Sequence, residues 1–95
     1  MIKKMGGNQR ASRKAKLEML AQNGVFAEIS FKLENGENIN LRSKLENRGG
    51  YWMTGYNIHL PIKDVRFNGH YTSLTVDVQK GSRVEEQLKY LRYIQ

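Results

Sequence analysis

Apolar and polar residues alternate strictly along much of residues 25–45. In the first half of this stretch the apolar row consists of Val25, Ala27, Ile29, Phe31 and Leu33, and in the second half of Ile39, Leu41 and Leu45. Alternation with a period of two is typical of a β-strand that buries one face. The stretch therefore predicts two strands joined by a hairpin.

The loop between these strands decides their register. An Asn-Gly pair at residues 35–36 is a strong hairpin signal, but a two-residue turn there would place Phe31 opposite Asn40. A three-residue loop with Gly36 in the left-handed region pairs Phe31 with Ile39 instead. Because a slip of one residue moves every side chain to the other face, we predict the three-residue loop.

Residues 51–62 form a third alternating run. The row expected in the core consists of Trp52, Thr54, Tyr56, Ile58, Leu60 and Ile62, and the outward row of Tyr51, Met53, Asn57 and His59. Gly55 interrupts the run and indicates a bulge or a close backbone approach. Pro61 has no N–H to donate to a ladder, so it places this strand at an edge or ends it.

Two further apolar runs complete the strands. A change of parity at residues 63–64 precedes a short strand with Val65 and Phe67, and Asn-Gly at residues 68–69 predicts a tight turn. The last strand has its apolar row at Thr72, Leu74, Val76 and Val78.

Helices are predicted at both ends of the strands. The first begins between Gln9 and Ser12, runs to Gln22 and ends at Asn-Gly, a favoured C-terminal signal. The second opens at Ser82, which forms a capping box with Glu85. Its apolar stripe consists of Val84, Leu88, Leu91 and Ile94.

The order of these elements predicts an α+β fold: an antiparallel meander sheet of four to five strands, with an N-terminal helix and a C-terminal helix packed on it. A chain of 95 residues has room for one modest core. We therefore expect residues 1–8 to be a flexible basic arm and residues 9–95 to be a single α+β domain.

Charge changes this picture, because it is distributed unevenly. Of the net charge of +7, residues 1–16 carry +6, since they contain six Lys and Arg and no Asp or Glu. The other 79 residues hold ten Lys and Arg against nine Asp and Glu. A nearly neutral body with a basic arm indicates a polyanionic partner, most often a nucleic acid. The alternative is a solvated terminus that aids solubility.

Residues 48–56 are the most suggestive segment for binding. Three aromatic residues stand within six positions, beside a basic turn of Arg48 and two glycines. Tyr51 and Trp52 point to opposite faces of a regular strand, so one of them is a candidate platform on which a base stacks. Tyr51 is that candidate, and the alternative that we prefer places Trp52 and Tyr56 in the core, with Tyr51 covering an edge of the sheet.

Other chemistries find little support. The chain has no Cys, which excludes disulfides and thiolate metal ligands, and no His, Asp and Glu spacing matches a metal site. His59 and His70 are the two groups that could act as an acid–base pair on RNA; ordinary surface histidines are the alternative that we prefer. We therefore predict no enzymatic activity, no metal and no cofactor.

No apolar run is long enough for a transmembrane helix, and residues 1–7 lack the apolar region of a signal peptide. We expect a cytoplasmic protein that is a monomer or a homodimer and has no membrane partner. The leading hypothesis is a small non-enzymatic module that binds DNA or RNA through its basic arm. The predicted nucleic-acid-binding residues are Lys3, Lys4, Arg10, Arg13, Lys14, Lys16, Arg48 and Tyr51. The alternative is a small protein-binding inhibitor or adaptor that meets an acidic surface of an enzyme or nucleoprotein complex.

Overall fold

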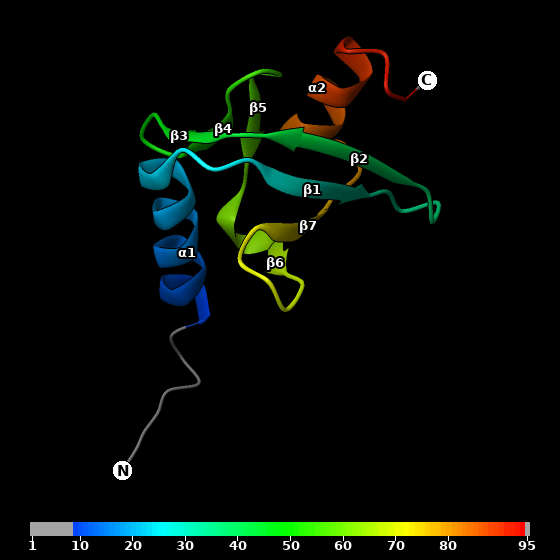
Figure 1. Cartoon of the computed structure of the whole chain (residues 1–95). Helices are drawn as coiled ribbons and strands as arrows, with labels where there is room; N and C mark the ends of the chain where they lie inside the picture. The colour runs from blue at the N-terminus through cyan, green and yellow to red at the C-terminus, as the bar shows by residue number, and fades with distance from the viewer. Residues whose placement is uncertain (1–8, 95) are drawn as a thin grey trace.

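The computed structural model describes residues 9–94 and the side chains of residues 12–94. The predicted arm, with Lys3 and Lys4, lies outside the described residues. In chain order the elements are α1 (Gln9–Asn23), β1 (Ala27–Lys32), β2 (Asn38–Ser43), β3 (Leu45–Asn47), β4 (Tyr51–Met53), β5 (Ile58–Leu60), the 3₁₀ helix η2 (Ile62–Asp64), β6 (Val65–Phe67), β7 (Ser73–Asp77) and α2 (Arg83–Tyr90). The α+β class is confirmed (Figure 1).

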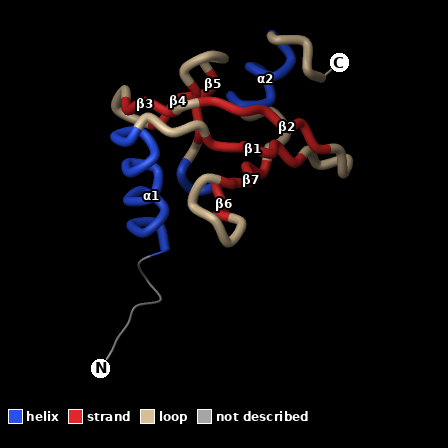
Figure 2. Tube along the Cα trace, in the orientation of Figure 1, coloured by secondary structure: helices blue, strands red, loops and turns tan. Residues whose placement is uncertain are grey.

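The strands, drawn in red in Figure 2, form two sheets. One has four strands in the order β2-β1-β7-β6, and the other has three in the order β3-β4-β5. In the first sheet β1 and β7 are parallel, with Ile29 beside Leu74 and Phe31 beside Val76, and the remaining pairs in both sheets are antiparallel.

The predicted single antiparallel meander of four to five strands is therefore wrong. Alternation shows which face of each strand is buried, but it does not show which strands pair. The chain leaves the first sheet after β2, builds the second sheet, and returns through Pro61 and η2. The β6–β7 hairpin then places β7 on the free side of β1.

The first hairpin has the predicted register. Phe31 lies opposite Ile39, and Ile29 lies opposite Leu41. Leu33 closes the loop by donating its N–H to Glu37 O (2.8 Å) and accepting a hydrogen bond from Gly36 N (3.0 Å). Gly36 has φ +93°, in the left-handed region. The three-residue loop is confirmed.

At Lys44 the chain passes from the first sheet into the second. The backbone runs from β2 into β3 with only Lys44 between them, and Lys44 O accepts hydrogen bonds from Ser43 Oγ (2.8 Å) and Thr54 N (3.0 Å). Ser43 and Leu45 are buried on either side of the exposed Lys44. The alternation of inward and outward side chains therefore continues through Lys44, so that one outer face extends over both sheets.

One hydrophobic cluster takes residues from both helices and both sheets. Leu17 and Leu20 are the buried residues of α1, and Val84 and Leu88 those of α2. The two helices lie on opposite sides of the strands (Figure 1). Both predicted helix boundaries are confirmed: Gly24 has φ +61° after α1, and Ser82 Oγ accepts a hydrogen bond from Glu85 N (3.2 Å) at the start of α2. Leu91 and Ile94 are partly buried against the core.

The outer edge of β5 is closed by a side chain. Gln87 of α2 accepts a hydrogen bond from His59 N (3.0 Å) and donates one to Asn57 O (3.2 Å). Its amide thus replaces part of a neighbouring strand at an edge that would otherwise be open. As predicted, the strand ends before Pro61.

Candidate nucleic-acid interface

The predicted cations of α1 separate onto two sides of the helix. Burial of Leu17 and Leu20 fixes the rotation of α1 against the core. Arg13 and Lys16 then line an open hollow of about 390 Å³ between α1 and β6. Lys16 Nζ lies 5.2 Å from the centroid of the Phe67 ring, a cation–π contact. Arg10 belongs to α1, but its side chain is outside the described part of the structure.

The hollow holds three basic residues, of which one is neutralised. Arg66 donates two hydrogen bonds of 2.9 Å to the Asp77 carboxylate, and this pairing raises the pKa of Arg66 above its ordinary value. Arg13 Nε is buried and has no acceptor within the described residues. Arg13 and Lys16 therefore supply the uncompensated charge in this hollow.

Lys14 lies on a different side of α1, near Glu18. The hydrogen bond from Tyr51 holds the pKa of Glu18 below its ordinary value, and the charge of Lys14 adds to this effect. Glu18 also accepts hydrogen bonds of 3.1 Å from Asn47 and from Gln22. Among the described side chains of α1, Lys14 is thus separated from Arg13 and Lys16, and the three do not form one continuous patch.

Tyr51 is not the exposed platform that the sequence predicts. Its side chain is only 2% exposed, and its hydroxyl donates a hydrogen bond to Glu18 Oε1. Burial, and secondarily the contact with Glu18, raises the pKa of Tyr51 to about 12. Trp52, which the sequence placed in the core, lies on the outer face of β4 and is only partly buried. No face of the Tyr51 ring is open to a base.

A turn explains this reversal. One parity from Trp52 to Ile62 is the sequence prediction, with Gly55 at a bulge or a close backbone approach within a single strand. Gly55 instead lies in a turn between β4 and β5, closed by the hydrogen bond from Asn57 N to Met53 O (2.8 Å). The turn changes parity, so that Met53 and Ile58 lie opposite each other and are both buried.

Trp52 is surrounded by cations and by an imidazole. Arg48 Cζ lies 5.3 Å, and Arg83 Cζ 6.0 Å, from the centroid of its ring, and the His59 ring is centred 5.2 Å away. Arg48 is held beside the ring by an ion pair with Glu46 and a 2.6 Å hydrogen bond to Asn57 Oδ1. Burial, and then the charge of Arg83, lowers the pKa of His59, which favours a neutral ring at neutral pH. The predicted residue Arg48 is thus part of a cluster, but with Trp52 and not with Tyr51.

Sequence reasoning missed a second such cluster. Phe26 is 48% exposed, with Arg42 Cζ at 4.9 Å and Lys44 Nζ at 5.3 Å from its ring centroid. The signal was present in the alternation, because Phe26 has the same parity as the polar residues of the first strand. A large apolar side chain in a solvent-facing row is informative where cations stand beside it.

Both aromatic clusters lie along the outer face around Lys44. The successive outward residues of the segment that runs from β2 into β3 are Arg42, Lys44 and Glu46, and Trp52 is the cross-strand neighbour of Glu46. We call this set the outer strip. Its residues are Phe26, Arg42, Lys44, Glu46, Arg48, Trp52 and Arg83. Four are cationic and one is acidic.

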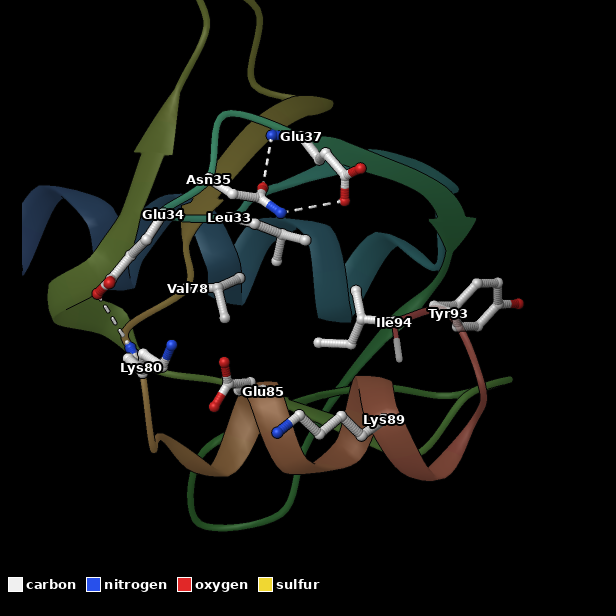
Figure 3. Close-up of a pocket in the computed structure, with 10 residues that line it drawn as sticks. All are labelled: Leu33, Glu34, Asn35, Glu37, Val78, Lys80, Glu85, Lys89, Tyr93 and Ile94. Carbon is white, nitrogen blue, oxygen red and sulfur yellow. Dashed lines mark hydrogen bonds between the residues drawn. The ribbon is translucent and has the colours of Figure 1, made fainter.

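A cleft on another part of the surface has a different chemistry. It encloses about 600 Å³ between the β1–β2 loop and α2. Figure 3 shows Leu33, Val78 and Ile94 pointing into it. Its rim carries both signs of charge, from Glu34, Glu37, Glu85, Lys80 and Lys89. Mixed charge over an apolar floor does not select a polyanion.

The two histidines make separate local contacts. His59 packs on Trp52, whereas His70 stacks on Tyr71 and its Nδ1 lies 2.8 Å from Thr72 Oγ1. Within residues 9–94, His, Asp and Glu side chains do not gather into a group of three that could hold a metal ion. The described helices include none that is long and apolar enough to cross a membrane.

Comparisons with known protein families, with curated proteins and with solved structures found no match. The candidate interface therefore rests on the geometry of the chain itself.

Proposed function

We propose that this protein is a small, non-enzymatic nucleic-acid-binding module. The observation that carries the proposal is the outer strip, where two aromatic rings on the protein surface each have two cations over them. Cations beside accessible rings offer both phosphate neutralisation and base stacking. Few other ligands use the two together.

The charge of the strip is available for binding. Within the described residues the ion pairs are Arg48–Glu46, Lys63–Asp64 and Arg66–Asp77. Arg42, Lys44 and Arg83 are therefore not committed to any carboxylate described in the structure. They can exchange water for phosphate oxygens without first breaking an ion pair.

The basic N-terminal residues supply the long-range attraction. Six of the seven net positive charges lie in residues 1–16, and clustered charge raises the rate and the strength of association with a polyanion. Arg13 and Lys16 extend this charge to the hollow beside β6. The arm thus supports affinity, and the strip supports recognition of the bases.

The salt dependence of binding tests this proposal. If about four phosphates are neutralised, log K should fall against log salt with a slope of about −3 to −4 on duplex DNA. The test variant replaces Lys3, Lys4, Lys14 and Lys16 with Gln. The matched control replaces four exposed lysines elsewhere, namely Lys32, Lys63, Lys80 and Lys89. Fluorescence anisotropy of a labelled oligonucleotide of about 20 nucleotides, measured between about 50 and 200 mM salt, gives both slopes.

In the test variant, the slope of log K against log salt should become shallower by about 0.9 for each phosphate contact removed. The control should keep the slope of the unaltered protein. Equal slopes in both variants would remove the N-terminal lysines from the interface. No detectable binding of the unaltered protein to any oligonucleotide at about 50 mM salt would overturn the proposed function itself.

A protein-binding inhibitor or adaptor is the second candidate, and the cleft in Figure 3 is the observation that favours it. Its volume of about 600 Å³ is within the range of ligand sites. Its apolar floor and two-signed rim suit a peptide rather than a polyanion. A partner that survives nuclease treatment, and is lost when Ile94→Asp alters the cleft floor, would favour this candidate over nucleic-acid binding.

A further inference from the structure

The two rings of the outer strip have different neighbours. Phe26 contacts Arg42 and Lys44, whereas Trp52 contacts Arg48 and Arg83 and lies across from Glu46. Among the described residues the two rings share no cation and make no ring–ring contact with each other. The rings are therefore separate platforms and do not form one stack.

We propose that the outer strip binds a single strand, with one base stacked on Phe26 and another on Trp52; this inference rests on the proposed function. Arg42, Lys44 and Arg83 contact the phosphates between and beside the two bases. An arginine guanidinium that lies over a ring can stay in place when a base binds, because bases stack on guanidinium planes as well as on aromatic rings. The ligand class is single-stranded DNA or RNA.

Two observations favour a single strand over a duplex. The bases of a duplex are already stacked on one another, so two separate surface rings gain nothing from them unless the strand is unpaired. In addition, carboxylates interrupt the cations of this face. Glu46 lies within the strip, and Glu28 lies opposite Arg42 in the register of β1 and β2. A duplex across this face would bring its phosphates close to both carboxylates. A single strand is narrower and can pass between them.

Trp52 offers a direct readout, because it is the only tryptophan in the chain. A base stacked on an indole quenches its fluorescence, so emission reports contact at this ring alone. The probes are oligothymidylate of about 12 nucleotides, oligouridylate of the same length, and the duplex of oligothymidylate with oligoadenylate. We expect both single strands, or one of them, to quench Trp52 and the duplex to leave its emission nearly unchanged. The comparison of the first two probes separates DNA from RNA.

Substitutions test each platform separately. Trp52→Phe keeps an aromatic ring, and Trp52→Leu removes it; Phe26→Tyr and Phe26→Leu form the matching pair. Loss of one stacked base should weaken single-strand binding about tenfold in each Leu variant, with little change in the salt slope. The aromatic replacements should stay close to the unaltered protein. Tyr90→Leu is the control, since Tyr90 is 86% exposed on α2, outside the strip.

The outcomes distinguish this inference from the proposed function. Binding without quenching, with equal affinity for duplex and single strand, would overturn the inference and leave the proposed function standing. Absence of binding to all three probes would overturn both. Phe26 is half exposed, so its Leu variant should fold even if the Trp52→Leu variant does not. Unchanged single-strand affinity in the folded Phe26→Leu variant would also contradict the two-platform arrangement.

Discussion

Tyr51→Phe isolates the hydroxyl that joins the core to α1. The ring of Tyr51 is 2% exposed, and its hydroxyl donates a hydrogen bond to Glu18. Phe preserves the buried ring and removes the donor. A hydrogen bond to a charged group contributes about 1.5–3 kcal/mol. Since Glu18 keeps Asn47 and Gln22 as donors, we expect a loss near the lower end, about 1–2 kcal/mol at pH 7.

The same hydroxyl makes stability depend on alkaline pH. Burial, followed by the contact with Glu18, raises the pKa of Tyr51 from 10.0 to about 12. In the unfolded chain the hydroxyl loses its proton from pH 10 upward, while the folded chain still holds it. The contribution of Tyr51 is therefore fully present below pH 10 and declines as the pH rises toward 12. At pH 11 the loss amounts to about 1.4 kcal/mol.

Urea unfolding followed by circular dichroism at pH 7 and pH 11 measures both effects. At pH 7 the variant should be less stable than the unaltered protein, and at pH 11 the difference should shrink by about 1.4 kcal/mol, nearly to zero. Tyr90→Phe serves as the control, because Tyr90 is 86% exposed. A difference that stays constant from pH 7 to pH 11 would refute the assignment of a buried, bonded hydroxyl. Tyr51 would then again be a candidate for an exposed ring on which a base stacks.

Two further predictions concern helix α2 and the first hairpin. Leu88 is fully buried and Lys89 is exposed, so Leu88→Ala should cost about 2–5 kcal/mol in urea unfolding and Lys89→Ala far less; similar costs would mean that α2 does not dock through Leu88. Gly36 has φ +93° and open space where a Cβ would stand, so Gly36→Val should cost about 1–2 kcal/mol from backbone strain alone. An unchanged urea midpoint in that variant would contradict the left-handed conformation of the loop.

The parts of the fold that sequence reasoning predicted correctly are those where two local signals agree. In the first hairpin, the Asn-Gly pair marks the position of the turn, and the alternation of the two strands selects the three-residue loop. At α2, the capping box at Ser82 and the stripe through Leu88 indicate the same start and the same buried face. Local patterns of this kind act over a few residues, so they can be read without knowing the rest of the chain.

Pairing between strands was not predictable in the same way. The alternation in β1 and β7 shows that Ile29 and Leu74 face the core, but a parallel neighbour and an antiparallel one satisfy that requirement equally well. The prediction for the β4–β5 connection was wrong for another reason. A short turn that changes parity looks, in the sequence, like a strand interrupted by Gly55. The assignments of Tyr51 and Trp52 depended on that single choice and were both reversed.

Residues of the candidate site were predictable only where the charged and aromatic residues are close together in the sequence. Arg48 was identified because it stands beside aromatic residues in the sequence. Arg83 and Phe26 are far from Trp52 and Lys44 along the chain, and the fold brings each of them to its partner. The cations of residues 1–16 could be counted from the sequence, but the separation of Arg13 and Lys16 from Lys14 on α1 follows from the burial of Leu17.

The segment that runs from β2 into β3 also explains how this small chain can keep binding separate from folding. Its inward residues, Ser43 and Leu45, are buried, whereas its outward residues, Arg42 and Lys44, are exposed and lie over the exposed ring of Phe26. Because inward and outward residues alternate, the strip can change its charge or lose the Phe26 ring without opening a cavity in the core. Stability should therefore respond to Tyr51 and Leu88, and affinity to Phe26 and Trp52. If the proposed function is correct, the two sets of substitutions act on different free energies.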